Sequence, residues 1–176
     1  MATVVLGEQD PKLQRSQSVT YASCRLESYN GSGVTGLVRF TQREGEQLLV
    51  QALVKNLTPG LHGFHVHEFG DLTDGCASTG GHFNPAGVSH GAHDAEERHA
   101  GDFRMMEAGE DGWAHYVYGD PLAMLSGPLS IVGRGLVLHG GVDDLGLGTD
   151  AASAKHGNSG PRVACCVIGL SSEPSF

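Results

Sequence analysis

Glycine is the residue that most constrains what this chain can fold into. The 176 residues include 27 glycines, scattered without the fixed period of a collagen or a repeat protein. Glycines spread in this way mark turns and ordered loops, and each one weakens a helix that would contain it. No long amphipathic helical pattern lies between them. We therefore expect strands joined by many turns.

Alternation of apolar and polar residues indicates where the strands lie. It runs through Val34–Thr41 and Leu48–Lys55, and a further strand is expected through His65 and His67. The later strand-like segments are Asp102–Glu107, Trp113–Tyr118, Ile131–His139 and Arg162–Leu170. Two glycine-rich stretches, 70–101 and 140–160, separate these segments, and loops of this length are usually functional or disordered. We predict an all-β sandwich or barrel of about eight strands with two long functional loops.

Length and charge limit the organisation and the partners. We predict one domain over 18–171, with a flexible N-terminal extension over 1–17 and a tail over 172–176. The first residues lack the basic start and long apolar core of a secretory signal, which predicts a cytoplasmic protein. The formal charge is −9, and neither a basic stripe nor a long apolar run occurs. Neither nucleic-acid binding nor a membrane span is expected.

Histidine is concentrated in one part of the chain. Seven of the ten histidines lie between His62 and His99. Side chains two apart on a strand share one face at a spacing of about 6.6 Å, so His65 and His67 can bind one ion together. The following loop adds His82, His90, His93, His99 and Asp102. Imidazole suits zinc, copper and iron, and three histidines with one carboxylate are a plausible zinc set. A solvated, histidine-rich loop is the alternative.

Four segments resemble the signature motifs of copper/zinc superoxide dismutases. They are Gly63–Asp71 (GFHVHEFGD), His82–Pro85 (HFNP), Glu97–Asp102 (ERHAGD) and Gly157–Cys165 (GNSGPRVAC). The resemblance covers roughly Ser18 to Leu170, with the spacing between matched positions kept. It implies a Greek-key, immunoglobulin-like β-barrel with an antioxidant oxidoreductase activity. That activity would convert superoxide to dioxygen and hydrogen peroxide, with one copper and one zinc ion per chain.

The same resemblance implies a ligand set. It places the copper ligands at His65, His67, His82 and His139, and the zinc ligands at His82, His90, His99 and Asp102. His82 would thus bridge the two ions. Residue spacing by itself does not connect His139 with this site; the resemblance does.

Other roles also follow from the resemblance. Asp143 matches a carboxylate that links His65 to His90, and Arg162 matches the guanidinium that receives the anion beside copper. The expected catalytic residues are His82, His139 and Arg162. Lys155 matches a channel lysine, and His156 either adds positive potential at the channel mouth or is an ordinary surface residue. His62, His93 and His115 are not expected to bind metal.

The four cysteines, Cys24, Cys76, Cys165 and Cys166, contain no C-x-x-C pair. In a cytosolic chain the first expectation is free, buried thiols. The resemblance implies a disulfide between Cys76 and Cys165. Neighbours on a strand face opposite sides, so Cys166 cannot also reach Cys76, and Cys24 is expected to be a buried thiol.

The chain departs from the family pattern at Phe103-Arg104-Met105, where Leu-Gly-Asn is usual. If that glycine has a positive φ, Arg104 would strain the loop and weaken zinc binding. A second hypothesis is therefore a catalytically weak metal-binding or copper-chaperone-type module. The sequence has neither an M-x-C-x-x-C copper motif nor a terminal C-x-C motif, and its complete copper-ligand set favours catalysis.

The resemblance implies partners as well. The substrate would be superoxide, and a copper chaperone would assist maturation. A homodimer would form through an apolar patch made of Phe69, Gly70, Val132, Gly133, Ile168 and Leu170. Because the chain is acidic, attraction of an anion requires local positive charge from the metals and Arg162. Gly141 replaces a channel lysine of the family, and Ala151 and Ala152 replace two loop glutamates. These losses partly cancel in sign, so we expect weaker steering rather than none.

Overall fold

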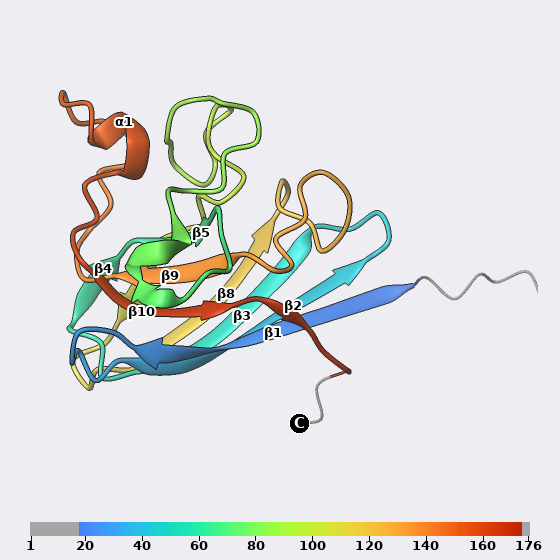
Figure 1. Cartoon of the computed structure of the whole chain (residues 1–176), viewed down its shortest axis with the longest axis horizontal. Helices are drawn as coiled ribbons and strands as arrows, with labels where there is room; N and C mark the ends of the chain where they lie inside the picture. The colour runs from blue at the N-terminus through green and yellow to red at the C-terminus, as the bar shows by residue number, and fades with distance from the viewer. Residues whose placement is uncertain (1–17, 174–176) are drawn as a thin grey trace, which may run out of the picture.

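The computed structural model describes residues 18–173 (Figure 1). The predicted extension 1–17 and most of the predicted tail 172–176 lie outside the described residues. The strands are β1 (Val19–Ser28), β2 (Thr35–Arg43), β3 (Leu48–Lys55), β4 (Gly60–His62), β5 (Phe64–His67), β6 (Thr73–Cys76), β7 (Met106–Ala108), β8 (Ala114–Asp120), β9 (Gly135–His139), β10 (Arg162–Val167) and β11 (Gly169–Leu170). The helical segments are the short 3-10 turn η2 (Ala77–Thr79) and α1 (Ser153–His156).

One curled antiparallel sheet of eight strands forms most of the molecule. Its order is β5-β9-β10-β1-β2-β3-β8, with β11 also paired to β1, and β4 and β7 form a separate two-stranded sheet. The prediction of an all-β barrel with two long loops is therefore confirmed. No helix within 18–173 has the length and apolar character needed to span a membrane.

The apolar alternation fixes which face of each strand points inward. On β3, Leu48, Val50, Ala52 and Val54 are buried, whereas the residues that alternate with them are at least partly exposed. Register pairs Val50 of β3 with Phe40 of β2, and both side chains lie in the core. A shift of one residue would turn this whole set to solvent, so the pattern specifies the pairing.

Several strand boundaries differ from the prediction. The sequence pattern missed β1, because its inward residues include Ala22 and Cys24, which give a weak apolar signal. The segment predicted as Asp102–Glu107 forms a strand only over Met106–Ala108, since Asp102 belongs to the loop and makes an isolated bridge with His65. The last predicted strand is interrupted at Ile168, which separates β10 from β11.

All four cysteines are in disulfides. Cys76 is bonded to Cys165, and Cys24 is bonded to Cys166, with Cα atoms 5.7 Å apart in each pair. The prediction of a free Cys24 thiol was wrong. β1 pairs with β10, so the inward side chains of these two strands meet in the core, where Cys166 faces Cys24. The adjacent residue, Cys165, points to the opposite face of β10 and meets Cys76 there. The strand pairing that brings them together was not visible in the sequence.

The two long loops lie at the same end of the barrel. Figure 1 shows the loop after β5 and the segment that carries α1 both rising from the part of the sheet formed by β5 and β9. These are the stretches 70–101 and 140–160. Four of their side chains, His82, His90, His99 and Asp143, are buried in the same cluster as the two histidines of β5.

Candidate metal centre

Three groups of side chains in the described part of the chain have ligand atoms within 4.8 Å of one another. Their members are His65, His67, His82 and His139; His82, His90, His99 and Asp102; and His65, His90 and Asp143. Every member is buried. The first two groups share His82, and the third connects them through Asp143.

Backbone pairing explains why residues far apart in sequence meet here. β5 carries His65 and His67 and pairs with β9, which ends at His139. The loop after β5 then folds back, and its backbone forms isolated β-bridges that pair His82 with His67 and Asp102 with His65. The histidines come from one sheet edge and from the loop that covers it.

The first group has the donor atoms of a copper site. His65 Nδ1, His67 Nε2, His82 Nε2 and His139 Nε2 are buried without a hydrogen-bond partner. Buried polar atoms are almost always paired, so nitrogen atoms left unpaired together indicate a missing ligand. Four imidazole nitrogens suit a copper ion. The residues therefore fit the metal that the resemblance implies.

The other nitrogen of each of these rings is already occupied, which fixes the tautomers. His65 Nε2 lies 2.7 Å from Asp143 Oδ2, and His67 Nδ1 lies 2.9 Å from the carbonyl oxygen of Gly80. His139 Nδ1 lies 3.2 Å from the carbonyl oxygen of Gly160. Each contact holds its ring with the free nitrogen toward the centre of the group.

The second group has the composition of a closed zinc site, three histidines and one carboxylate. Asp102 Oδ1 lies 2.8 Å from His82 Nδ1 and 3.1 Å from His99 Nδ1. Asp102 Oδ2 lies 3.0 Å from His90 Nδ1. This contact is short but is not aligned as a hydrogen bond, so His90 Nδ1 is also a buried nitrogen without a hydrogen-bond partner. His82 thus presents Nδ1 to this group and Nε2 to the other.

Asp143 holds one histidine of each group. Its carboxylate accepts hydrogen bonds from His65 Nε2 at 2.7 Å and from His90 Nε2 at 2.8 Å. Both rings are therefore protonated at Nε2 and leave Nδ1 free for a metal. Gly157 makes room for this arrangement, because a Cβ there would overlap the Asp143 carboxylate, and its φ of +64° is one that favours glycine.

Burial keeps two histidines of the copper-type group, His67 and His139, uncharged. Burial, and then the neighbouring imidazole of His65, lower the pKa of His139 to about 3. Burial and the adjacent rings of His82 and His139 hold the pKa of His67 well below its usual range. The rings of His67 and His139 are therefore neutral at pH 7, which is the form that binds metal.

The zinc-type group differs, because carboxylates surround it. Burial opposes protonation of His90, but the adjacent carboxylates of Asp102, 3.0 Å from Nδ1, and Asp143, 2.8 Å from Nε2, outweigh it and raise the pKa of His90 to about 9. Burial also opposes ionisation of Asp102, yet hydrogen bonds from the neighbouring histidines hold its pKa well below the usual range. Without metal, His90 is a cation between two carboxylates at pH 7.

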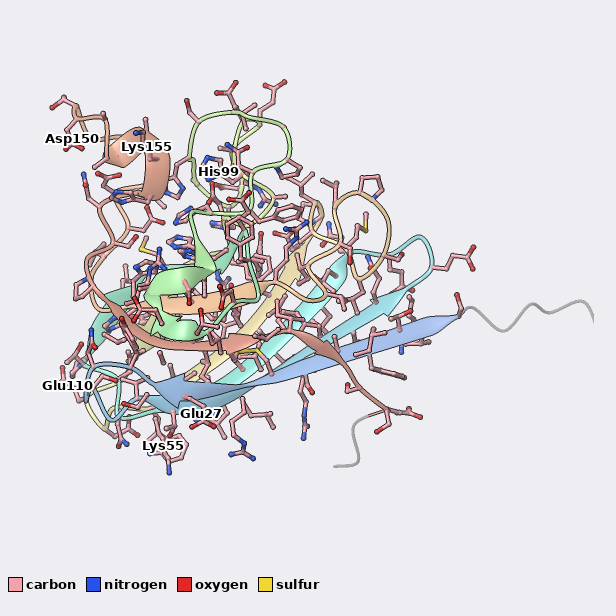
Figure 2. The ribbon with its side chains drawn as sticks, in the orientation of Figure 1. Glu27, Lys55, His99, Glu110, Asp150 and Lys155 are labelled. Atoms are coloured by element: carbon pink, nitrogen blue, oxygen red, sulfur yellow. A yellow bond between two sulfur atoms is a disulfide. The ribbon has the colours of Figure 1, made fainter. Side chains whose placement is uncertain are left out.

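Arg162 lies at the first residue of β10, opposite His139 in the sheet register. Its guanidinium donates to the carbonyl oxygens of Cys76, Ala77 and Gly80 and to the Thr79 hydroxyl. The arginine is thus oriented by the segment that the Cys76–Cys165 disulfide attaches to β10. Figure 2 shows Lys155 on α1 at the same end of the molecule as His99, and Lys155 and His156 are exposed.

The sequence reasoning missed Arg98 and Asp120, which position the zinc-type loop. Arg98 donates to the carbonyl oxygens of His99 and Asp102 at 3.2 and 3.1 Å, and to Asp120 Oδ2 at 2.9 Å. Both charges are buried. Arg98 precedes a predicted ligand in sequence, but an arginine in a polar loop is normally solvated, so the sequence alone gave no reason to pair it with a strand residue.

Histidines outside the ligand sets have other contacts. His62 is buried with both ring nitrogens engaged, Nδ1 at 2.9 Å from the carbonyl oxygen of His139 and Nε2 at 2.8 Å from that of Thr58. His93 packs edge-on against Tyr118. His115 is exposed. None of the three belongs to a metal-binding group of the described residues.

The expected strain at Arg104 is absent. The non-glycine residues with positive φ in the described chain are Asn30, Asn56, Leu145 and Asn158. Arg104 instead donates a 3.1 Å hydrogen bond to the carbonyl oxygen of Val117, and its own carbonyl accepts one from the Tyr116 hydroxyl at 2.9 Å. Its guanidinium lies 5.7 Å from the centre of the Tyr116 ring. The substitution attaches the loop end to β8.

Comparison with known proteins agrees with this geometry. Residues 34–168 match the family model described as copper/zinc superoxide dismutase. A protein of Onchocerca volvulus named Superoxide dismutase [Cu-Zn] is 49% identical over 144 residues, which cover 80% of this chain and 91% of the relative. The matched region includes every residue of the three groups described above. This chain belongs to the copper/zinc superoxide dismutase family.

Proposed function

We propose that this chain is a superoxide dismutase that combines two superoxide anions and two protons into dioxygen and hydrogen peroxide. The observation that carries the proposal is the sharing of His82 between an all-histidine group and a histidine–carboxylate group. The all-histidine group has four buried nitrogens without a hydrogen-bond partner, and the histidine–carboxylate group has one, His90 Nδ1. The Onchocerca volvulus relative is named as a superoxide dismutase.

One copper and one zinc ion per chain complete the site. When bound, copper supplies one-electron redox chemistry, and zinc supplies a fixed positive charge that does not change oxidation state. His65, His67, His82 and His139 would hold the copper. His82, His90, His99 and Asp102 would hold the zinc.

Arg162 is proposed to receive the superoxide anion. Four acceptor groups fix its guanidinium beside His139, so it needs no reorganisation when an anion arrives. The molecule as a whole is acidic, and a local cation of this kind is what allows an anion to approach. Lys155 is exposed on α1 and is proposed to add to the positive field of the channel, with His156 beside it as a weaker contributor.

His82 is proposed to move a proton at Nε2. Its Nδ1 lies 2.8 Å from Asp102, whereas Nε2 is unpaired and buried. A proton held at Nε2 would lie at the centre of the all-histidine group, from which it can be given to the reduced product. Asp102 and Asp143 keep the surrounding rings in place while this proton is exchanged.

A dismutation assay on metal-loaded protein tests the proposal. We expect turnover in the parent chain, a loss of copper and activity in His139→Ala, and a fall of about tenfold or more in rate with both metals retained in Arg162→Ala. Arg43→Ala, a surface change on β2, serves as the matched control and should be active. Absence of turnover in the parent with both metals bound would favour the alternative, a catalytically weak metal-binding or copper-chaperone-type module.

We also propose a cytoplasmic homodimer that receives copper from a chaperone. Phe69 and Leu170 of the predicted dimer patch are 50% and 66% exposed, which supports a contact surface. Ile168 of the same patch is fully buried in the core, so it would support the contact only from beneath. Light scattering tests the dimer: a single-chain mass at micromolar concentration would contradict it.

A further inference from the structure

The outer face of β1, β2, β3 and β8 carries a groove that the metal centre does not use. Its volume is about 640 Å³. The sheet register places Leu53 of β3 beside Leu37 of β2, and Gln51 of β3 beside Val117 of β8. Leu53 is 43% exposed and Val117 is 60% exposed. The solvent face of an antiparallel sheet is normally polar, so a row of exposed aliphatic side chains there indicates a contact surface.

Cations flank this aliphatic row. Arg25, Arg39 and Lys55 line the groove, and Glu27 is the one acidic residue among its lining residues. Within residues 18–173, none of the three cations has an ion-pair partner. The full chain has a formal charge of −9, so the groove is opposite in sign to the protein that carries it.

Aromatic character completes the surface. Trp113 lines the groove immediately before β8 and is 41% exposed. Tryptophan and arginine are among the residues most enriched where protein interfaces concentrate their binding energy. Glu110 and Asp111 lie in the turn before Trp113 but do not line the groove. Figure 2 shows Glu27 and Lys55 pointing outward at the end of the molecule away from His99.

We propose that this groove binds a segment of another protein that carries acidic side chains on both sides of an aliphatic anchor. The anchor would cover Leu53 and Val117, and the carboxylates would pair with Arg39 and Lys55. Two copies of this chain joined face to face would place like charges together, which opposes that occupant. A nucleic acid would use the cations but would leave the aliphatic row uncovered.

The test uses Trp113, because it is the single tryptophan of the 176-residue chain and its emission reports on this groove alone. The probe is a short synthetic peptide with two central leucines and two glutamates on each side. Its comparison peptide has lysine in place of glutamate. Both peptides are titrated into three proteins at low and at high salt. The proteins are the parent chain, the double variant Arg39→Glu with Lys55→Glu, and the single variant Arg43→Glu.

We expect the acidic peptide to shift the Trp113 emission saturably, more tightly at low salt, and the lysine peptide to leave it unchanged. The double reversal Arg39→Glu with Lys55→Glu should weaken binding by about tenfold or more. Arg43→Glu changes an exposed cation on the same strand and face outside the groove, so it should bind almost as the parent. All variants should retain dismutation, which shows that they fold and separates this test from that of the proposed function.

Three results would overturn the inference. The first is no emission shift with the acidic peptide. The second is equal binding of a single-stranded RNA oligomer, which would assign the face to polyanions. The third is a change in Trp113 emission on removal of residues 1–17 without any peptide, which would assign the groove to the chain's own N-terminal segment.

Discussion

At the scale of single residues, the site depends on which nitrogen of each ring is free. Asp143, Gly80 and Gly160 each occupy one nitrogen of a histidine, and the opposite nitrogen then faces the metal group. The chemistry is therefore set by acceptors that do not themselves bind metal.

Replacement of Asp143 tests this directly. In Asp143→Asn the side chain can accept from only one of the two imidazoles, so His65 or His90 loses its orientation. We expect zinc affinity, measured by competition with a chelator, to fall by about 10- to 100-fold. Asp144→Asn changes the adjacent carboxylate, which holds Ser153 and Asn158 and no ligand. If both variants lose affinity equally, the effect is a general loosening of the loop.

Protons released on zinc binding give a second test at this scale. The pKa of His90 is about 9 in the metal-free protein, so this ring is charged at pH 7 and must lose its proton when Nδ1 binds zinc. We expect zinc to release about one proton at pH 7, about half a proton at pH 9 and about a tenth at pH 10, with zinc affinity rising from pH 7 toward pH 9. The measurement is calorimetry in buffers of different ionisation enthalpy. A proton count that is constant from pH 7 to pH 10 would contradict the charged state of His90.

At the scale of strands and loops, Arg104 joins the end of the zinc-type loop to β8. The variant Arg104→Gly removes the hydrogen bond to the Val117 carbonyl oxygen and the contact with the Tyr116 ring. We expect the free energy of unfolding, measured with denaturant, to fall by about 1–2 kcal/mol, with zinc affinity unchanged. A gain in zinc affinity would instead mean that Arg104 strains the loop.

The two disulfides are predicted to differ in function. Cys76–Cys165 joins β6 to β10 over a separation of 89 residues, and its loss should lower the free energy of unfolding by about 3–5 kcal/mol. Because Arg162 donates to the segment that begins at Cys76, Cys76→Ser with Cys165→Ser should also lower the rate of the metal-loaded protein. Cys24→Ala with Cys166→Ala removes the disulfide in the main core and should reduce stability but not turnover. Equal loss of turnover in both pairs would contradict the link to Arg162.

At the scale of the whole molecule, the all-β class and the two functional loops could be predicted, because alternation and glycine placement are local properties. Strand β1 could not, since Ala22 and Cys24 give too little apolar contrast. The Cys24–Cys166 disulfide depends on β1 lying beside β10, which is a long-range pairing that no local pattern encodes. The same holds for Arg98 and Asp120, which are 22 residues apart and meet only in the folded chain.

In the metal site, too, local sequence pattern predicted some ligands, whereas long-range strand pairing determined the others. The spacing of His65 and His67 predicted a shared ion, and the composition of the loop predicted a zinc set. The resemblance, not the pattern, connected His139 to them, because β9 reaches β5 only through the sheet order. Charge also has meaning only at this scale: a chain of formal charge −9 carries Arg162 at one end and the cationic groove on its outer sheet.

The central claim is that one ring, His82, serves two metal ions. Crystals of metal-loaded protein measured with anomalous diffraction at the copper and zinc absorption edges test it most directly. We predict copper within bonding distance of His82 Nε2 and zinc within bonding distance of His82 Nδ1. Copper on the His65, His67 and His139 set with His82 turned away from either ion, or a single metal position in the site, would contradict it.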